Sequence, residues 1–212
     1  MSRRLPVYIL IDTSGSMKGE PIESVKVGLS DMIASLRLDP WALETICISI
    51  ITYDKDVKQI LPLTKLENLQ LPDIACPDSG PTLTGAALNM LCDCYDHEVN
   101  MGSKDQKGDW MPLLYVLTDG KPSDLMVYDE AIKNVKRHQF SNIVACAAGP
   151  KAKTEPLKKL TDNVFTLDTM DSIPFIITIN LGMPPPLIRE KAAEATTMSE
   201  LPPPPSEVSI VV

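Results

Sequence analysis

An apolar run that ends in a carboxylate and two hydroxyls constrains the fold of this chain more than any other feature. Residues Leu5–Ile11 are almost entirely apolar, and Asp12, Ser14 and Ser16 follow at alternate positions. Such a run is typical of a buried strand, and an unpartnered carboxylate is costly to bury there. The three side chains therefore offer oxygen donors just beyond the strand, which suit Mg²⁺, Mn²⁺ or Ca²⁺. Capping of a following helix is the alternative that this motif alone leaves open.

Two further segments place oxygen donors at the tips of loops. The segment Ser79–Leu88 presents Thr82 after a Gly-Pro turn and before an apolar helix, and Asp119 follows a second buried strand that ends at Thr118. Two carboxylates and three hydroxyls on three loops exceed what helix caps require. The sequence therefore favours a shared cation site.

The chain alternates between strand-like and helix-like segments, and this alternation predicts a mainly parallel sheet with helices on both faces. We expect six strands, over residues 5–11, 44–53, 57–63, 111–117, 142–148 and 164–167. Helices are expected over residues 21–36, 84–96, 125–135 and 154–160, with Ser123 or Asp124 capping the third. The isoleucines of residues 171–181 favour a strand, but Asp171 as a cap and Gly182 as a stop lead us to expect a helix there. The predicted fold class is α/β, doubly wound, with residues 57–63 as one antiparallel edge strand. Donors at the carboxyl ends of such strands can converge.

The composition changes near residue 183, which we take as a domain boundary. Seven of the nineteen prolines lie in residues 183–212, as Pro184–Pro186 and Pro202–Pro205. Polyproline segments stay extended and do not join a core. We therefore expect a domain over residues 1–182 and a disordered tail over 183–212. The last residues, 207–212, either fray, which we favour, or add as a strand to a partner's sheet.

Charge and cysteine content narrow the setting of the protein. The formal net charge of −8 argues against nucleic acid or an anionic membrane as the main partner. The N-terminus lacks the apolar segment of a signal peptide, and no stretch approaches the ~20 apolar residues of a membrane span. Five scattered cysteines fit a reducing, cytoplasmic compartment.

The three motifs together resemble the von Willebrand factor type A (VWA) domain over residues 5–182. Their order, D-x-S-x-S, T-x-T-G-x-A-L and L-T-D-G, is that of its metal-ion-dependent adhesion site, the MIDAS. The resemblance implies a Rossmann-like fold and a Mg²⁺ site, with Mn²⁺ or Ca²⁺ as alternatives. It makes Ser14 and Ser16 direct ligands, and Thr82 a ligand that contacts the ion directly or in exchange with water. It has Asp12 and Asp119 act through water or hydrogen bonds.

The same resemblance implies how a partner would bind. An open coordination position near Ser14, Ser16 and Thr82 would accept a Glu or Asp of a protein partner. Thr84 matches a position that is not usually a ligand, and we leave it out.

Within this family the chain is similar to the bacterial TerY-like proteins of tellurium-resistance and stress gene clusters. The shared stretches are Arg4–Asp12, Gly19–Ile22, Gly108–Pro112 and Thr118–Pro122. This resemblance implies a regulatory or scaffold role alongside a partner protein kinase and a protein phosphatase.

An enzymatic role is not expected. Phosphatases of the haloacid-dehalogenase type need a second Asp where this chain has Ser14, and His97 and His138 are expected in a loop and at a helix end, solvated and away from the site. A binding module is the preferred interpretation. The alternative is a phospho-acceptor with a structural metal site, modified at tail hydroxyls such as Thr196, Thr197 or Ser199.

Overall fold

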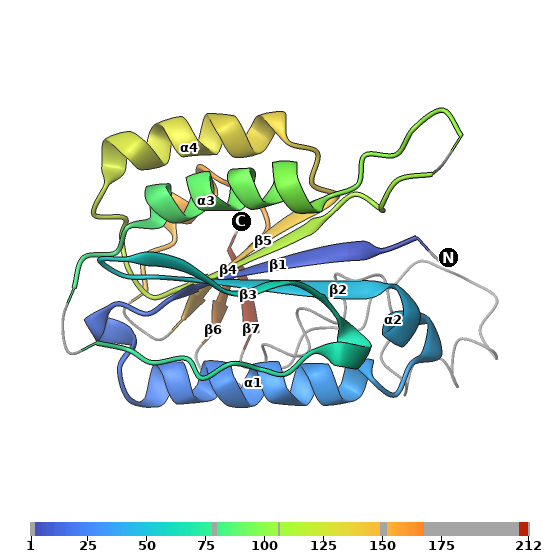
Figure 1. The fold of residues 1–212 in the computed structure, drawn as a ribbon. Helices are drawn as coiled ribbons and strands as arrows, with labels where there is room; N and C mark the ends of the chain where they lie inside the picture. Colours follow the sequence, from blue (N-terminus) through green and yellow to red (C-terminus); the bar gives the residue numbers. More distant parts are fainter. Residues whose placement is uncertain (1–2, 78–79, 106, 149–151, 168–207, 212) are drawn as a thin grey trace.

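A computed structural model describes residues 3–77, 80–105, 107–148, 152–167 and 208–211. Seven strands in these residues form one sheet between two layers of helices (Figure 1). The strand order is β3-β2-β1-β4-β5-β6-β7. The strands are β1 (Leu5–Asp12), β2 (Ile46–Tyr53), β3 (Val57–Lys65), β4 (Leu113–Thr118), β5 (Asn142–Ala148), β6 (Val164–Leu167) and β7 (Val208–Val211).

The predicted doubly wound, mainly parallel sheet is confirmed. Strands β2, β1, β4, β5 and β6 run parallel to one another, and β3 forms the predicted antiparallel edge through a hairpin with β2. The structure adds a seventh strand at the other edge, where β7 pairs antiparallel with β6. The terminal residues were expected to fray or to join a partner's sheet, whereas residues 208–211 pair with this chain's own sheet. The expected helix over 171–181 lies outside the described residues.

The helices are α1 (Glu20–Leu36), α2 (Pro40–Thr45), α3 (Thr84–Glu98), α4 (Leu125–Arg137) and α5 (Glu155–Lys158), with short 3-10 turns η1 (Gly15–Met17) and η2 (Leu66–Asn68). Helix α1 covers one face of the sheet, and α3 and α4 lie side by side over the other (Figure 1). Helix α2 was not predicted. The sequence does mark its start, since Asp39 is a favourable N-cap residue and Pro40 suits the first helical position. In the structure Asp39 accepts hydrogen bonds from Trp41 N and Ala42 N.

The core has one apolar cluster on each face of the sheet. Side chains of β1 alternate between them, so Ile9 packs with the cluster that includes Leu29 of α1, while Leu10 packs with Leu88 of α3 and Tyr128 of α4. Burial on both faces explains why this strand is apolar at nearly every position.

Strand β1 is flanked by β2 on one side and β4 on the other, so the chain reverses its direction of travel across the sheet at this point. The loops after β1 and β4 leave neighbouring strand ends, because Ile11 pairs with Leu117. Ligands of open α/β sheets bind at such a point. The fold therefore brings Asp12 and Asp119 together at the end of the sheet where the parallel strands have their carboxyl ends.

Candidate metal centre

Asp12 ends β1 in the interior of the protein, with none of its surface exposed. Its Oδ1 accepts a hydrogen bond from the backbone N–H of Ser14 (2.8 Å), and its Oδ2 accepts one from the Thr118 hydroxyl (2.6 Å). Burial raises the pKa of Asp12, the charge of Asp119 adds to this rise, and the hydrogen bonds from Thr118 and Ser14 oppose it. Both carboxylate oxygens are thus engaged in positioning the loops after β1 and β4.

A row of hydrogen-bonded oxygens leads from Asp12 to the surface. The hydroxyls of Ser14 and Ser16 are 3.2 Å apart, and Ser16 Oγ donates to Asp119 Oδ1 at 2.9 Å. Ser14 is buried, Asp119 is half-buried and Ser16 is exposed. Four of the five predicted site residues therefore form one connected group that opens to solvent.

The helix-cap alternative for these residues is not what the structure shows. Ser14 precedes η1, but its side chain accepts no capping hydrogen bond, and α1 begins after Gly19, which has no side chain to cap it. The hydroxyls of the D-x-S-x-S motif are directed at each other and at Asp119. A signal that fits a cap in the sequence thus serves a shared polar site in the fold.

Thr82 approaches the group from the loop before α3 and is 8% exposed. Its backbone N–H donates to the Ser123 hydroxyl at 3.0 Å, and the N–H of Ser123 donates to its carbonyl at 2.9 Å. A Cβ built on Gly120 would lie 3.7 Å from Thr82 Oγ1, so the Thr82 hydroxyl faces the residue that follows Asp119. All five predicted residues therefore lie at the carboxyl end of the sheet.

The prediction that Ser123 or Asp124 caps its own helix is wrong. Neither side chain caps α4: Ser123 accepts from Thr82, and Asp124 accepts from Gly85 N (3.1 Å) and Ala86 N (2.9 Å) in the first turn of α3. Because α3 and α4 lie side by side, a carboxylate between them reaches the free N–H groups of the neighbouring helix. Sequence spacing alone shows only the local option.

Two further residues fix the loop after β1, and sequence reasoning did not single them out. Thr13 N donates to Tyr53 O at 2.9 Å, and the Thr13 hydroxyl donates to Asp54 Oδ2 at 3.1 Å. Asp54 also belongs to the β2–β3 turn, where its Oδ1 accepts a hydrogen bond from Asp56 N. Its second oxygen ties the β2–β3 turn to the metal-site loop.

A buried tyrosine lies beneath the site. The Tyr53 hydroxyl has no hydrogen-bond partner of acceptable geometry among the described residues, and burial raises its pKa well above the usual range, with a further contribution from the charge of Asp12. Thr84 and Thr118 are the neighbouring hydroxyls that oppose this rise. Thr84 therefore faces the interior, in agreement with its omission from the predicted donors.

The donor chemistry of the group fits a hard divalent cation. It consists of carboxylate and hydroxyl oxygens, which suit Mg²⁺, Mn²⁺ or Ca²⁺. Across the part of the chain that the structure describes, no cluster of three or more His, Cys, Asp or Glu side chains could hold a metal. A cation at the five candidate residues would therefore depend on hydroxyl donors, which are three of the five.

The histidines do not contribute to this edge of the sheet. His97 was expected in a loop but lies in the last turn of α3, where its Nδ1 is 2.6 Å from Asp93 O. His138 follows α4, is largely buried rather than solvated, and stacks edge-on against Tyr95 while its Nε2 lies 3.2 Å from Asp96 Oδ1. Both occupy the helix ends remote from the metal-site loops, because α3 and α4 begin at those loops.

Comparison with known proteins identifies the domain. The sequence profile of the von Willebrand factor type A domain matches residues 7–178. Matrilin-1 of Bos taurus is 31% identical over 127 residues, which cover 58% of this chain and 23% of that protein. Matrilin-3 of Gallus gallus is 29% identical over 127 residues, or 58% of this chain and 27% of that protein. This chain thus spans about a quarter of the length of these curated relatives.

Solved structures share the fold. Proximal thread matrix protein 1 from the mussel byssus, in a structure with a zinc-occupied MIDAS motif, aligns with a TM-score of 0.59 at 13% identity, covering 84% of this chain and 46% of that one. The pilus adhesin SpaC of Lactobacillus rhamnosus GG aligns with a TM-score of 0.65 at 12% identity, covering 85% of this chain and 30% of that one.

Proposed function

We propose a function from two facts: the chain belongs to the von Willebrand factor type A domain family, and its oxygen donors gather at one edge of the sheet. The proposed function is metal-dependent binding of a protein partner through a Mg²⁺ site of the MIDAS type, with Mn²⁺ or Ca²⁺ as alternative ions. Ser14, Ser16 and Thr82 hold the ion, and Asp12 and Asp119 orient them. The domain does not act as an enzyme.

The observation that carries the proposal is the engagement of both Asp12 oxygens by Ser14 N and Thr118 Oγ1. A carboxylate used in this way positions the loop and leaves the neutral hydroxyls of Ser14 and Ser16, which lie against each other and Asp119, as donors for the cation. When bound, a cation held mainly by hydroxyls keeps much of its charge and offers an open position to a carboxylate. The partner residue is therefore a Glu or an Asp.

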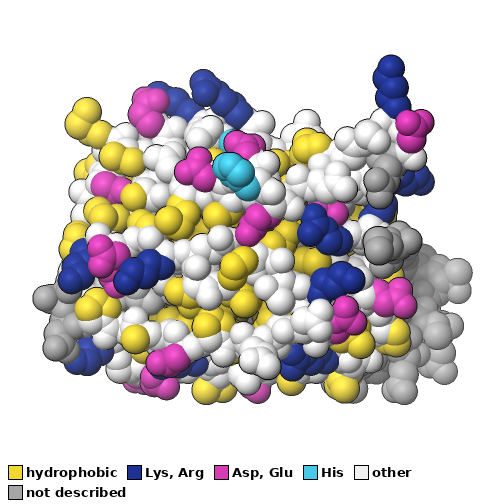
Figure 2. Space-filling view, in the orientation of Figure 1, with side chains coloured by type: hydrophobic (Ala, Val, Ile, Leu, Met, Phe, Trp, Pro, Cys, Tyr) yellow, Lys and Arg dark blue, Asp and Glu magenta, His cyan; other side chains and the backbone are white. Residues whose placement is uncertain are grey.

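The surface charge supports capture through the ion rather than through a basic patch. The chain carries a net charge of −8, and Figure 2 shows acidic and basic side chains interspersed on the face that it draws. A hollow of about 480 Å³ lies beside Thr13 and Asp54, and its wall carries both lysines and carboxylates: Lys55, Lys58, Asp56 and Asp73. This hollow gives room for partner residues that flank the captured carboxylate.

The proposal also includes a biological setting for the domain. The motifs shared with TerY-like proteins support a regulatory or scaffold role in a bacterial stress or tellurite-resistance system, with a protein kinase and a protein phosphatase as partners. Among the described residues, no helix is long and apolar enough to cross a membrane. All five cysteines are free, which supports a reducing compartment such as the cytoplasm. The tail hydroxyls of the phospho-acceptor alternative lie outside the described residues.

Metal binding is tested by calorimetric titration of Mg²⁺ and Mn²⁺ into wild type and the variants Ser16→Ala and Asp119→Ala. Both residues lie at the rim, so their removal leaves the core intact, whereas Asp12→Ala would strand two buried hydrogen-bond donors. We expect each rim variant to lower the metal affinity at least tenfold, which is about 1.4 kcal/mol. Equal affinity in wild type and Asp119→Ala would refute the site.

Asp56→Ala is the matched control. It removes the same charge from the turn after β2, at the same edge of the sheet, and Asp56 is exposed and outside the donor set. Its metal affinity should equal that of the wild type. Partner capture is then tested by retrieval from lysate with Mg²⁺ or EDTA, using wild type, Asp119→Ala and Asp31→Ala, because Asp31 is an exposed carboxylate of α1 outside the donor set and the hollow, whereas Asp56 lines the hollow. Partners that bind equally to all three proteins, or equally in EDTA, would contradict capture through the metal.

A further inference from the structure

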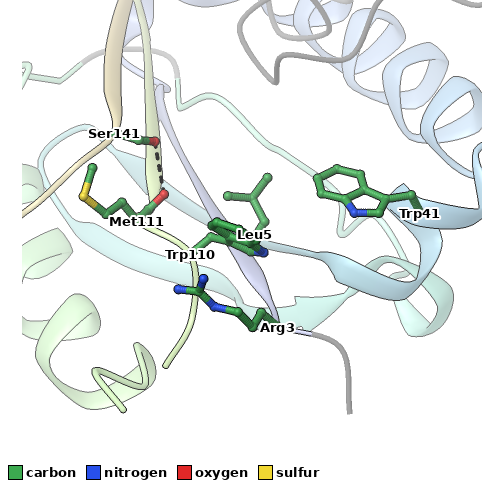
Figure 3. Close-up of a pocket in the computed structure, with 6 residues that line it drawn as sticks. All are labelled: Arg3, Leu5, Trp41, Trp110, Met111 and Ser141. Atoms are coloured by element: carbon green, nitrogen blue, oxygen red, sulfur yellow. Dashed lines mark hydrogen bonds between the residues drawn. The ribbon is translucent and has the colours of Figure 1, made fainter. Parts of the chain in front are cut away.

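The two tryptophans of the chain lie near the amino ends of the parallel strands, at the end of the sheet opposite the metal centre. Trp41 belongs to α2, which precedes β2, and Trp110 comes shortly before β4. They line a hollow of about 510 Å³ together with Arg3, Leu5, Met111 and Ser141 (Figure 3). Leu5 begins β1 and Ser141 precedes β5, so the hollow lies at the amino ends of the parallel strands.

Both indoles are unusually accessible for such large apolar groups. Trp41 is 44% exposed and Trp110 is 46% exposed, and the neighbouring Met111 is 50% exposed. Exposed aromatic groups that gather in one hollow mark an interaction site more often than a monomer surface. Each indole carries one N–H group, which can donate a hydrogen bond to an occupant of the hollow.

Trp110 is held in place by a network that has no role at the metal centre. The Arg3 guanidinium stacks on its ring at 3.9 Å and donates to Gly108 O (2.8 Å) and Asp109 O (3.0 Å). Arg4 pairs with both oxygens of Asp109, whose side chain is 5% exposed, and Trp110 N donates to Arg4 O. The exposed ring is thus pre-organised, which lowers the entropy cost of binding.

Aromatic hollows with N–H donors suit one class of ligand especially well. A polyproline II segment has no internal hydrogen bonds, so its carbonyls are free to accept, and its rings pack on aromatic faces. The sequence of this chain has three consecutive prolines, Pro184–Pro186, followed by Leu187 and Ile188. The segment lies after residue 178, where the match to the family ends.

The segment is long enough to reach the hollow. Strand β6 ends at Leu167 on the metal-centre edge, about 30 Å from the hollow, given a strand length of about 25 Å and a spacing of about 4.8 Å between strands. Residues 168–184 span at most about 55 Å when extended, and still about 36 Å with a helix over 171–181. The second proline run, Pro202–Pro205, begins six residues before β7 and reaches only about 20 Å.

We propose that the Trp41–Trp110 hollow is the docking site of this chain's own Pro184–Pro186 segment. Tethering on the same chain gives the segment an effective concentration of about millimolar, so a weak contact suffices to fill the hollow. The docked segment covers both indoles and accepts hydrogen bonds from their N–H groups. Docking at this edge leaves the metal centre at the other edge free.

The test uses the intrinsic fluorescence of the full chain, since the only two tryptophans both line the hollow. The variant carries Pro184→Ala, Pro185→Ala and Pro186→Ala, and the matched control carries Pro202→Ala, Pro203→Ala, Pro204→Ala and Pro205→Ala. We expect a red-shifted emission and an acrylamide quenching constant raised about twofold in the variant, because its indoles lose their cover. The control should behave as the wild type.

A peptide of residues 183–188 added to the variant should restore the wild-type emission at about millimolar concentration. The same peptide should leave a further variant carrying Trp110→Phe unshifted, and circular dichroism checks that this variant is folded. Equal quenching in wild type and the Pro184–Pro186 variant would overturn the proposal, as would an equal effect of the control. A wild-type signal that depends on protein concentration would also overturn it, because the occupant would then be the segment of a second copy.

Discussion

Gly85 is the position where a single methyl group should disturb both the fold and the metal centre. It lies in the first turn of α3, and a Cβ at this position would meet Tyr128 N at 2.4 Å and Tyr128 Cα at 2.7 Å. These are backbone atoms of α4, which cannot move aside as a flexible side chain would. Gly85→Ala must therefore push the N-terminal ends of α3 and α4 apart by about 1 Å to reach normal contact distances.

The expected loss of stability follows from three terms. Overpacking of a tight contact costs about 1–3 kcal/mol. Separation of the helices also weakens the hydrogen bonds from Gly85 N and Ala86 N to Asp124, and bonds to a charged group contribute about 1.5–3 kcal/mol each. The better helix propensity of Ala returns about 1 kcal/mol. With partial loss of the two bonds, we expect a net destabilisation of about 2–4 kcal/mol.

The assay is urea unfolding monitored by circular dichroism, with Mg²⁺ titration on the folded protein. Because Thr82 N donates to the Ser123 hydroxyl and Ser123 N donates to Thr82 O, the shift should also displace this donor and weaken metal binding. Gly80→Ala is the matched control, since its Cβ would meet no atom closer than 3.7 Å. Its stability should equal or exceed that of the wild type by up to about 1 kcal/mol. A Gly85→Ala protein within about 1 kcal/mol of the wild type would refute the close-approach argument.

Three further predictions address other parts of the molecule. Asp124→Asn should destabilise the protein by about 1–3 kcal/mol in urea unfolding, because a neutral acceptor bonds the α3 N-terminus less strongly, and an unchanged midpoint would contradict the cross-helix cap. Asp109→Ala should cost about 1.5–3 kcal/mol and raise the quenching of Trp110, since Arg4 and Asn100 N lose their acceptor. Burial raises the pKa of the Cys92 and Cys146 thiols to about 12, whereas thiols of the unfolded chain ionise near about 8.5. Iodoacetamide should therefore label these two cysteines at far higher pH in the native protein than in urea. Equal pH profiles of labelling by mass spectrometry would contradict their burial.

The sequence was sufficient to predict the sheet because its central strands β1, β2 and β4 are buried on both faces. An apolar run such as Leu5–Ile11 is typical of a strand that is covered on both faces, and the alternation of such runs with amphipathic helices predicts parallel strands. It was not sufficient for α2, because six residues carry little periodic signal and Thr45 is continuous with the strand that follows. The pairing of β7 with β6 was equally out of reach, since long-range pairing leaves no local trace.

The same division applies to the metal centre. The five candidate donor residues could be proposed from their positions at strand and helix ends, and the structure brings them together at the carboxyl end of the sheet. The residues that fix them could not. Thr118 and Asp124 look like ordinary strand and cap residues, and their partners Asp12 and Gly85 are 106 and 39 positions away. Only the three-dimensional fold shows which loop each of them supports.

These supporting contacts divide the centre into two units. The loops after β1 and β4 are joined side chain to side chain, through Thr118 to Asp12 and through Ser16 to Asp119. Thr82 belongs to a second unit, because its backbone bonds to Ser123 and the caps from Asp124 join its loop to the start of α4. A displacement of the α3–α4 pair would therefore move Thr82 with it and change the position of Thr82 relative to Ser14 and Ser16. Any change in donor set between two states of the site should occur at Thr82, since the other four residues are bonded to one another.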